Sequence, residues 1–197
     1  MLSYVDVLLH GKPVGQRVAI VGAGGIGFDV AEYLVTGADR GEPSPTLHLD
    51  EWKREWGVGD PARTPGGLDR PQPTPPSRQV TLLQRKPGKH GAGLGKTSGW
   101  VHRATLKMKN VEMLGGVNYE RVTDEGLFVT FGPERRDGTL LEVDTIVLCS
   151  GQEPLRELMA PLAAAGLKVH LVGGADEASE LDAKRAINQG TRLAATL

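Results

Sequence analysis

The fold of this chain is decided by the stretch RVAIVGAGGIG at residues 17–27. Residues 17–21 form a short, mainly apolar and β-branched run, which is typical of a buried strand in a parallel sheet. The glycines that follow interrupt this strand, and residues 28–35 then have the composition of a helix. The order of strand, glycine turn and helix predicts an α/β fold: a Rossmann-like, three-layer domain built on a parallel sheet.

The glycine turn fits the pattern G-x-G-x-x-G, with Gly22, Gly24 and Gly27 at its fixed positions. The first glycine permits a tight turn, the second lets a diphosphate approach the backbone, and the third lets helix and strand pack closely. The helix that follows offers free N–H groups and the positive end of its dipole. We therefore interpret the turn, including Gly25 and Ile26, as a dinucleotide-binding site. A purely structural turn is the alternative.

A second strand is predicted at residues 79–83, and two cations, Arg85 and Lys86, follow it. Dinucleotide sites usually place an acidic residue here, where it binds the 2′-hydroxyl of the ribose. A 2′-phosphate calls for cations instead, because a guanidinium binds it through two hydrogen bonds and a lysine adds a point charge. The pair therefore favours NADP(H) over NAD(H) or FAD in this pocket. A solvated basic loop is the alternative.

A loop with five glycines and two lysines is predicted at residues 87–99. Its glycine spacing is one residue too short for a mononucleotide phosphate loop, so we reject that kind of site. Because the loop follows the second strand, we expect it at the carboxyl edge of the sheet, beside the cofactor. There Lys96 and Arg103 either reach a phosphate or are simply exposed. Nearby His102 is expected to be structural or solvated.

The rest of the chain is predicted from its turn signals and apolar runs. A long surface insertion is expected at residues 37–78, which hold eight of the 13 prolines. The other expected elements are a short helix within the insertion at 47–56, a helix at 100–109, a strand at 111–114, a small antiparallel β-meander at 117–143, a parallel strand at 145–149, a last strand at 169–172 and a helix at 183–197.

Composition and charge are ordinary for a globular protein, with 39% hydrophobic and 24% charged residues. The net charge of −1 gives no reason to expect nucleic acid or an anionic membrane as a partner. The apolar runs are too short to cross a bilayer, and Asp6 and His10 interrupt the apolar start, so we expect no signal peptide and a cytoplasmic location.

Cys149 is the single cysteine, which excludes an internal disulfide or a cysteine-built iron–sulfur site within this sequence. We expect it to pack as a small hydrophobe, and we assign no metal ligand and no catalytic residue.

Several motifs resemble the nucleotide-binding region of bacterial NADPH-dependent 2,4-dienoyl-CoA reductases, a family that is also similar to trimethylamine dehydrogenase. The resemblance runs from near Tyr4 to the C-terminus. Its motifs are VAIVGAGGIGFDVA at 18–31, LQRK at 83–86, GLGKTSGWVHR at 93–103, SGQEP at 150–154, VHLVGG at 169–174 and ELDAKRAI at 180–187.

The resemblance implies a larger protein, in which an FMN-bearing TIM barrel and a 4Fe–4S cluster are joined to an FAD-binding part. In that part, an NADPH-binding domain is inserted between two halves of an FAD domain. Hydride would pass from NADPH to FAD, and electrons would pass through the cluster to FMN, which reduces a dienoyl-CoA. On this mapping, residues 1–12 are an N-terminal linker, residues 13–154 the NADP(H)-binding domain, and residues 155–197 the closing piece of the FAD domain.

Four further cofactor-binding residues come with this mapping. Gly151 and Gln152 belong to the SGQEP motif, and Gly174 and Asp176 would lie near FAD. From the residues alone, an N-cap for the final helix is the plainer account of Asp176.

The sequence departs from the family pattern because it has a single G-x-G-x-x-G, no barrel and one cysteine. We therefore expect a fragment or a separate subunit that binds NADPH, needs the FAD half and the FMN barrel in cis or as another chain, and is inactive alone. Two other functions stay open. One is a free-standing NADP-dependent dehydrogenase, although none of Tyr4, Tyr33 and Tyr119 fits the Tyr-x-x-x-Lys of short-chain enzymes. The other is a non-catalytic dinucleotide-binding redox sensor.

Overall fold

The computed structural model describes residues 1–41, 47–179 and 183–197. Residues 42–46 of the predicted insertion and residues 180–182 of the ELDAKRAI motif lie outside these ranges. The chain divides into two compact units, Met1–Ser150 and Gly151–Leu197. None of the described helices is both long and apolar enough to cross a membrane.

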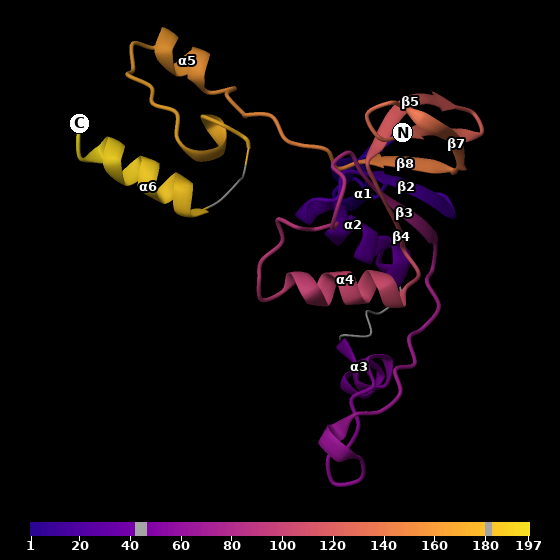
Figure 1. Ribbon diagram of the computed structural model, residues 1–197. Coiled ribbons are helices and arrows are strands. Elements are labelled where there is room, and N and C mark those ends of the chain that lie inside the picture. Colours follow the sequence, from indigo (N-terminus) through magenta and orange to yellow (C-terminus); the bar gives the residue numbers. More distant parts are fainter. Residues whose placement is uncertain (42–46, 180–182) are drawn as a thin grey trace. The chain divides into compact units, whose positions relative to one another are not determined.

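A five-stranded parallel sheet forms the centre of the first unit (Figure 1). Its strands, in the order β1-β8-β2-β3-β4, are β1 (Leu2–Ser3), β8 (Thr145–Leu148), β2 (Arg17–Val21), β3 (Gln79–Gln84) and β4 (Glu112–Gly115). The chain moves outward from β2 to β3 and β4, and β8 then returns to the other side of β2. Such a reversal is a topological switch point, and open α/β sheets bind ligands at the carboxyl edge beside it. The four strands expected in this unit are confirmed.

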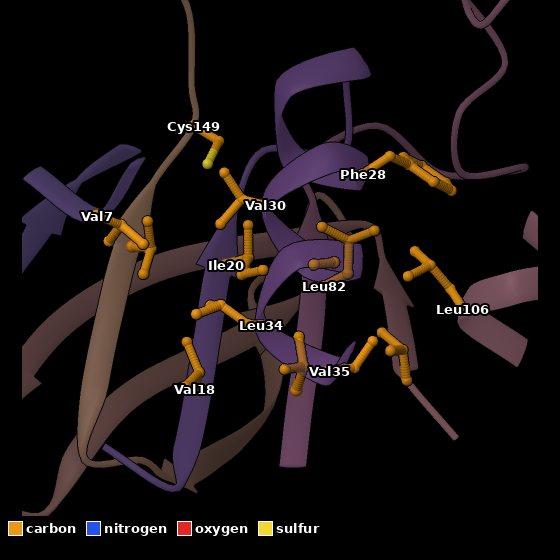
Figure 2. Close-up of a cluster of buried hydrophobic side chains, with 14 residues drawn as sticks. Val7, Val18, Ile20, Phe28, Val30, Leu34, Val35, Leu82, Leu106 and Cys149 are labelled. Atoms are coloured by element: carbon orange, nitrogen blue, oxygen red, sulfur yellow. The ribbon is translucent and has the colours of Figure 1, made fainter. Parts of the chain in front are cut away.

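Helices cover one face of the sheet. They are α1 (Tyr4–Leu8), α2 (Gly25–Thr36) and α4 (Gly99–Met108), so the helices expected at 28–35 and 100–109 are confirmed. Leu34 of α2 is fully buried with Ile20 of β2 and Leu82 of β3, as Figure 2 shows. Burial stabilises a side chain of this kind by about 1.5–3 kcal/mol, so this interface holds α2 firmly against the sheet.

The predicted meander covers the other face. It consists of β5 (Val117–Thr123), β6 (Gly126–Phe131) and β7 (Arg136–Glu142), paired antiparallel in that order. Val117 and Val129 of the meander are buried in one cluster with Ala19, Leu83 and Ile146 of the parallel sheet. Helices, parallel sheet and meander are therefore three layers, and the predicted Rossmann-like fold class is confirmed.

Residues 1–12, expected as a linker, contain β1 and α1. Ser3 and Asp6 form a capping box at the start of α1: Asp6 N donates to Ser3 Oγ at 3.1 Å, and Ser3 N donates to Asp6 Oδ2 at 2.9 Å. Val7 is only 1% exposed and packs in the helical core cluster. Leu2 and Tyr4 pack against the same cluster, and β1 pairs with β8, so the stretch is part of the sheet and its core.

A buried ion pair joins the two ends of the insertion, which we call its neck. The Arg78 guanidinium is 3% exposed and donates to both carboxylate oxygens of Asp39 at 2.6 Å. It also donates to the carbonyl oxygens of Gly15 and Leu34. The short 3-10 helices η1 (Ala38–Arg40) and η3 (Pro65–Gly67) and the helix α3 (Leu49–Trp56) belong to the insertion, so the helix expected at 47–56 is confirmed.

A second buried ion pair attaches α3 to the C-terminal end of α4. Lys109 donates to Glu55 of α3 and to both oxygens of Thr74, the hydroxyl at 2.5 Å and the carbonyl at 3.1 Å. The side chains of Lys109 and Glu55 are 2% and 9% exposed. The Pro-rich insertion is therefore anchored to the core at two separate points, although it is irregular over most of its length.

The second unit contains α5 (Met159–Ala164), the 3-10 helix η4 (Gly173–Ala175) and α6 (Ala183–Ala194). The helix expected at 183–197 is confirmed, whereas the strand expected at 169–172 is wrong. Val172 is extended, but the described part of this unit contains no strand with which it can pair. An apolar, β-branched run becomes a strand only when a neighbouring strand accepts its backbone hydrogen bonds.

We expect Lys109→Met to lower the free energy of unfolding by about 3 kcal/mol, because it leaves the Glu55 carboxylate buried without its cation. Urea unfolding followed by tryptophan fluorescence measures this, since Trp52 and Trp56 lie on α3. Lys107→Met is the matched control: Lys107 is exposed on the same helix and its loss should cost less than about 0.5 kcal/mol. Equal stabilities of the two variants would contradict the anchoring role.

Candidate functional site

The carboxyl ends of three parallel strands meet at one edge of the sheet. Val21 of β2 is in register with Leu83 of β3 and with Leu148 of β8. Beyond these residues, Gly22 N donates to Leu83 O at 3.0 Å, and Cys149 N donates to Val21 O at 2.8 Å. The glycine turn, the end of β3 and the end of β8 are thereby held together at the switch point.

Two glycines of the turn have no room for a side chain. Gly22 has a φ of +113°, and a Cβ there would lie 2.5 Å from the carbonyl oxygen of Cys149. A Cβ on Gly27 would lie 1.8 Å from the carbonyl oxygen of Gly22. These are the close approaches of turn to strand and of helix to strand that the first and third glycines of a dinucleotide turn provide.

The middle of the turn is open. A Cβ on Gly24 would meet no heavy atom within 4 Å, and one on Gly25 would meet only Leu94 Cδ2, at 4.0 Å. Gly24 is the N-cap of α2 and gives the helix no side-chain cap, so the first N–H groups of α2 are left for a ligand or solvent. Ile26 turns inward and packs against the core. The turn therefore combines free donors with space beside them, which fits a diphosphate.

The two cations after β3 have a fixed backbone and exposed side chains. The carbonyl oxygen of Lys86 accepts hydrogen bonds from Gln84 Nε2 at 2.7 Å and from Gly116 N at 3.3 Å. Arg85 and Lys86 are themselves exposed. Their charges are available to an anionic ligand at the edge where the turn lies.

Tyr119 of the meander is a neighbour of Arg85 that the sequence does not reveal. Burial raises the pKa of the Tyr119 hydroxyl, and the positive charge of Arg85 acts in the opposite direction. The two residues are far apart in the sequence, and only the packing of the meander on the sheet brings them close. No local motif could have identified this pair.

The glycine-rich loop packs on the start of α2. A Cβ on Gly91 would lie 2.6 Å from Leu94 and 2.9 Å from Phe28, so the loop backbone is close to both side chains. Arg103 Nη1 donates to the carbonyl oxygen of Gly91 at 3.2 Å, whereas Lys96 is exposed. Of the two candidate phosphate ligands in this region, Arg103 therefore holds the loop by a hydrogen bond to its backbone. Lys96 faces solvent, where a ligand can reach it.

His102 and Cys149, two further residues considered from the sequence, take part in packing and in contacts between elements. His102 Nδ1 lies 2.8 Å from Glu32 Oε1 and links α4 to α2. Cys149 is buried, and burial raises the pKa of its thiol to about 12. A thiol with such a pKa is protonated at neutral pH and packs as a small hydrophobe, as expected.

The remaining candidates lie in the second unit. Gly151 and Gln152 are exposed in its first residues, Gly151 with a φ of +92°. Gly174 lies in η4, and Asp176 follows it. Gln189 Nε2 of α6 donates to Asp176 Oδ2 at 2.7 Å. The N-cap interpretation of Asp176 is wrong, because residues 177–179, which directly follow it, are not helical, and its side chain contacts Gln189 of α6 instead.

Within the described ranges, no group of three or more His, Cys, Asp and Glu side chains is arranged to hold a metal ion.

A family profile described as "Pyridine nucleotide-disulphide oxidoreductase" matches residues 4–182. Among solved structures, 2-naphthoyl-CoA reductase in complex with 2-naphthoyl-CoA is similar, with a TM-score of 0.64 and 16% identity over 98% of this chain and 23% of that chain. Histamine dehydrogenase from Rhizobium sp. 4-9 has a TM-score of 0.65 and 11% identity over 100% of this chain and 26% of that one. Thioredoxin reductase of T. acidophilum has a TM-score of 0.55 and 13% identity over 100% of this chain and 56% of that one. At these identities the likeness is one of fold, and the chain spans about a quarter of the length of the first two proteins.

We expect Gly27→Ala and Gly24→Ala to separate the two kinds of glycine in the turn. The methyl group at position 27 would collide with the Gly22 carbonyl, so we expect a loss of about 3 kcal/mol or more in the free energy of unfolding. The methyl group at position 24 meets open space, so the change should stay within about 1 kcal/mol. Urea unfolding measures both, and a Gly24 variant as unstable as the Gly27 variant would contradict the geometry.

Proposed function

The chain belongs to the pyridine nucleotide-disulphide oxidoreductase family, and from this premise we propose that it is the NADPH-binding part of a flavin-dependent reductase of the 2,4-dienoyl-CoA reductase type. Its task is to deliver hydride from NADPH to FAD. Proteins of this family bind FAD and NAD(P), so the coarse redox function follows from membership. The observation that carries the finer proposal is the open glycine turn at the switch point with Arg85 and Lys86 at the end of the adjoining strand.

The diphosphate of the dinucleotide binds across the start of α2. The uncapped N–H groups there and the open space at Gly24 supply donors and room, and the helix dipole adds a partial positive charge. Gly25 and Ile26 contribute backbone on the same turn. The chain holds the cofactor here and, in this proposal, contributes no catalytic side chain: the nicotinamide and the flavin carry the redox chemistry.

The 2′-phosphate of the adenosine ribose binds to Arg85 and Lys86. Both are exposed at the edge of the sheet where the turn lies, and no carboxylate stands between residues 79 and 89 to hold a free 2′-hydroxyl. Lys96, which is exposed, adds a further positive charge, while Arg103 keeps the glycine-rich loop against α2. The pocket therefore selects NADPH.

Residues 13–154 form the NADP(H)-binding domain in this proposal, and residues 155–197 are the closing piece of an FAD domain. Gly174 and Asp176 lie near FAD, and Gly151 and Gln152 are cofactor-binding residues at the end of the NADP(H)-binding domain. The described part of the second unit supports an incomplete domain, because Gly173 is its only buried residue. Many of its large apolar side chains are exposed, among them Leu155, Leu158, Leu167, Ile187 and Leu197. Apolar surface of this extent is typical of a face that another part of a protein covers.

The rest of the electron path lies outside this sequence. One G-x-G-x-x-G serves one dinucleotide, so the FAD diphosphate is bound by another segment, in cis or on a partner chain. The family name includes a disulphide, but a single cysteine with a raised pKa cannot form an internal disulfide. We propose that electrons leave FAD for a 4Fe–4S cluster and FMN in the full-length protein, with a dienoyl-CoA as final acceptor, and that the isolated chain is inactive.

Reconstitution tests this function against its alternatives. The purified chain should bind NADPH without catalysing its oxidation, and supplying the FAD-loaded remainder of the flavoprotein should restore NADPH-dependent flavin reduction. Turnover by the chain without flavin would instead indicate a free-standing dehydrogenase. NADPH binding without any flavin reduction in the complete protein would indicate a sensor.

We expect Arg85→Glu to raise the Kd of NADPH by about tenfold or more, because a charge-assisted hydrogen bond to phosphate contributes about 1.5–3 kcal/mol. The Kd of NADH, which lacks the 2′-phosphate, should change by less than about threefold. Calorimetric titration with both nucleotides measures this. Arg63→Glu is the control, since Arg63 is exposed on the insertion. An equal loss of affinity for NADPH and NADH would overturn the assignment of Arg85 and Lys86 to the 2′-phosphate.

A further inference from the structure

A cavity of about 400 Å³ lies between α2, α3 and α4, lined by residues of all three helices. None of the glycines at positions 22–27 lines it, so it is separate from the glycine turn. Its volume is within the range of sites for small organic molecules, which runs from about 300 to 1,000 Å³. The anchored insertion supplies one wall, because Glu55 and Lys109, the pair that attaches α3 to α4, are among the lining residues.

Three aromatic side chains line this cavity. Tyr33 comes from α2, and Trp52 and Trp56 come from consecutive turns of α3. The two indole rings are stacked, with centroids 6.1 Å apart and planes inclined by 29°. The faces of such rings carry negative potential and attract organic cations, and tryptophan is the strongest of the three aromatic types.

Two carboxylates of α2, Asp29 and Glu32, line the same cavity. They are three residues apart on one helix, a spacing at which like charges repel. Burial raises the pKa of Glu32, the charge of Asp29 raises it further, and His102 acts in the opposite direction. The carboxylate of Glu32 is therefore partly desolvated, and His102 is its hydrogen-bond partner in the cavity.

The basic side chains among the described lining residues do not offset this charge. Lys109 is one of them, and its ammonium is held by Glu55 and Thr74. The other is His102, and its Nδ1 serves Glu32. Lys109 and Glu55 pair with each other, which leaves two carboxyl groups, Asp29 and Glu32, against one imidazole, His102. The cavity thus joins aromatic walls to an excess of acidic groups over basic ones.

We propose that this cavity binds a small organic ammonium ion, with its alkyl groups against Trp52 and Trp56 and its charge facing Glu32 and Asp29. The site takes a molecule that is both cationic and apolar, because the indole faces bind the alkyl groups and the carboxylates bind the charge. Inorganic cations match only the carboxylates, and neutral apolar molecules match only the rings. The proposal is independent of the nucleotide function.

Choline and its neutral isostere 3,3-dimethylbutan-1-ol form a matched pair of probes, since the two have the same shape and differ in charge. Titrating each into the purified full chain, by calorimetry and by tryptophan fluorescence, should give binding of choline at least about tenfold tighter than that of the alcohol. A change in fluorescence should accompany it, because two of the three tryptophans line the cavity. Equal affinities, or no binding of choline, would overturn the proposal.

Variants locate the binding. Trp52→Leu and Glu32→Gln should each weaken choline binding about tenfold while leaving the Kd of NADPH unchanged. Trp100→Leu and Glu51→Gln are the controls, because Trp100 is 59% exposed on α4, Glu51 is exposed on α3, and neither lines the cavity. If Trp52→Leu fails to fold, Glu32→Gln decides alone, since a glutamine keeps the shape and can still accept from His102. If the control variants weaken choline binding as much as the cavity variants do, choline binds elsewhere and the proposal is overturned.

Discussion

The contact on which this structure depends is the approach of Gly27 to the carbonyl group of Gly22, so close that a Cβ would lie 1.8 Å from that oxygen. It sets α2 directly on the end of β2, and from there Phe28 and Leu34 reach the core of the sheet. The same contact aims the uncapped start of α2 at the edge where β3 and β8 also end. The packing of α2 and the accessible, uncapped start of this helix are therefore two consequences of one tight turn.

The two faces of the sheet are covered by different kinds of structure. Helices cover one face, while the meander covers the other and brings Tyr119 near Arg85. The switch point between β2 and β8 then leaves the carboxyl edge accessible to a ligand. The proposed dinucleotide site consequently depends on the order of the strands and on the turns at their carboxyl ends, more than on any one side chain.

Two buried ion pairs make the insertion part of the domain. Arg78 and Asp39 close its neck, and Lys109 and Glu55 fix α3 against α4. Buried ion pairs contribute little net stability compared with apolar contacts of the same volume, but removing one partner is costly, so they define where the insertion attaches. The cavity between α2, α3 and α4 exists because of this attachment, and its aromatic and acidic lining combines residues of the insertion with residues of the core.

The sequence by itself determined the elements whose signals are local. The run at 17–27, the strand expected at 79–83, the cations after it and the meander expected at 117–143 could all be predicted, because alternation, turn residues and the glycine pattern act over a few neighbouring positions. Tertiary structure alone decided the rest. It pairs β1 with β8, leaves Val172 without a strand partner in the described second unit, and joins residues 39 positions apart at the insertion neck and 54 apart at α3. Strand pairing and buried ion pairs form between groups that are distant along the chain, and their free energy depends on which surfaces the fold brings together, which no local pattern records.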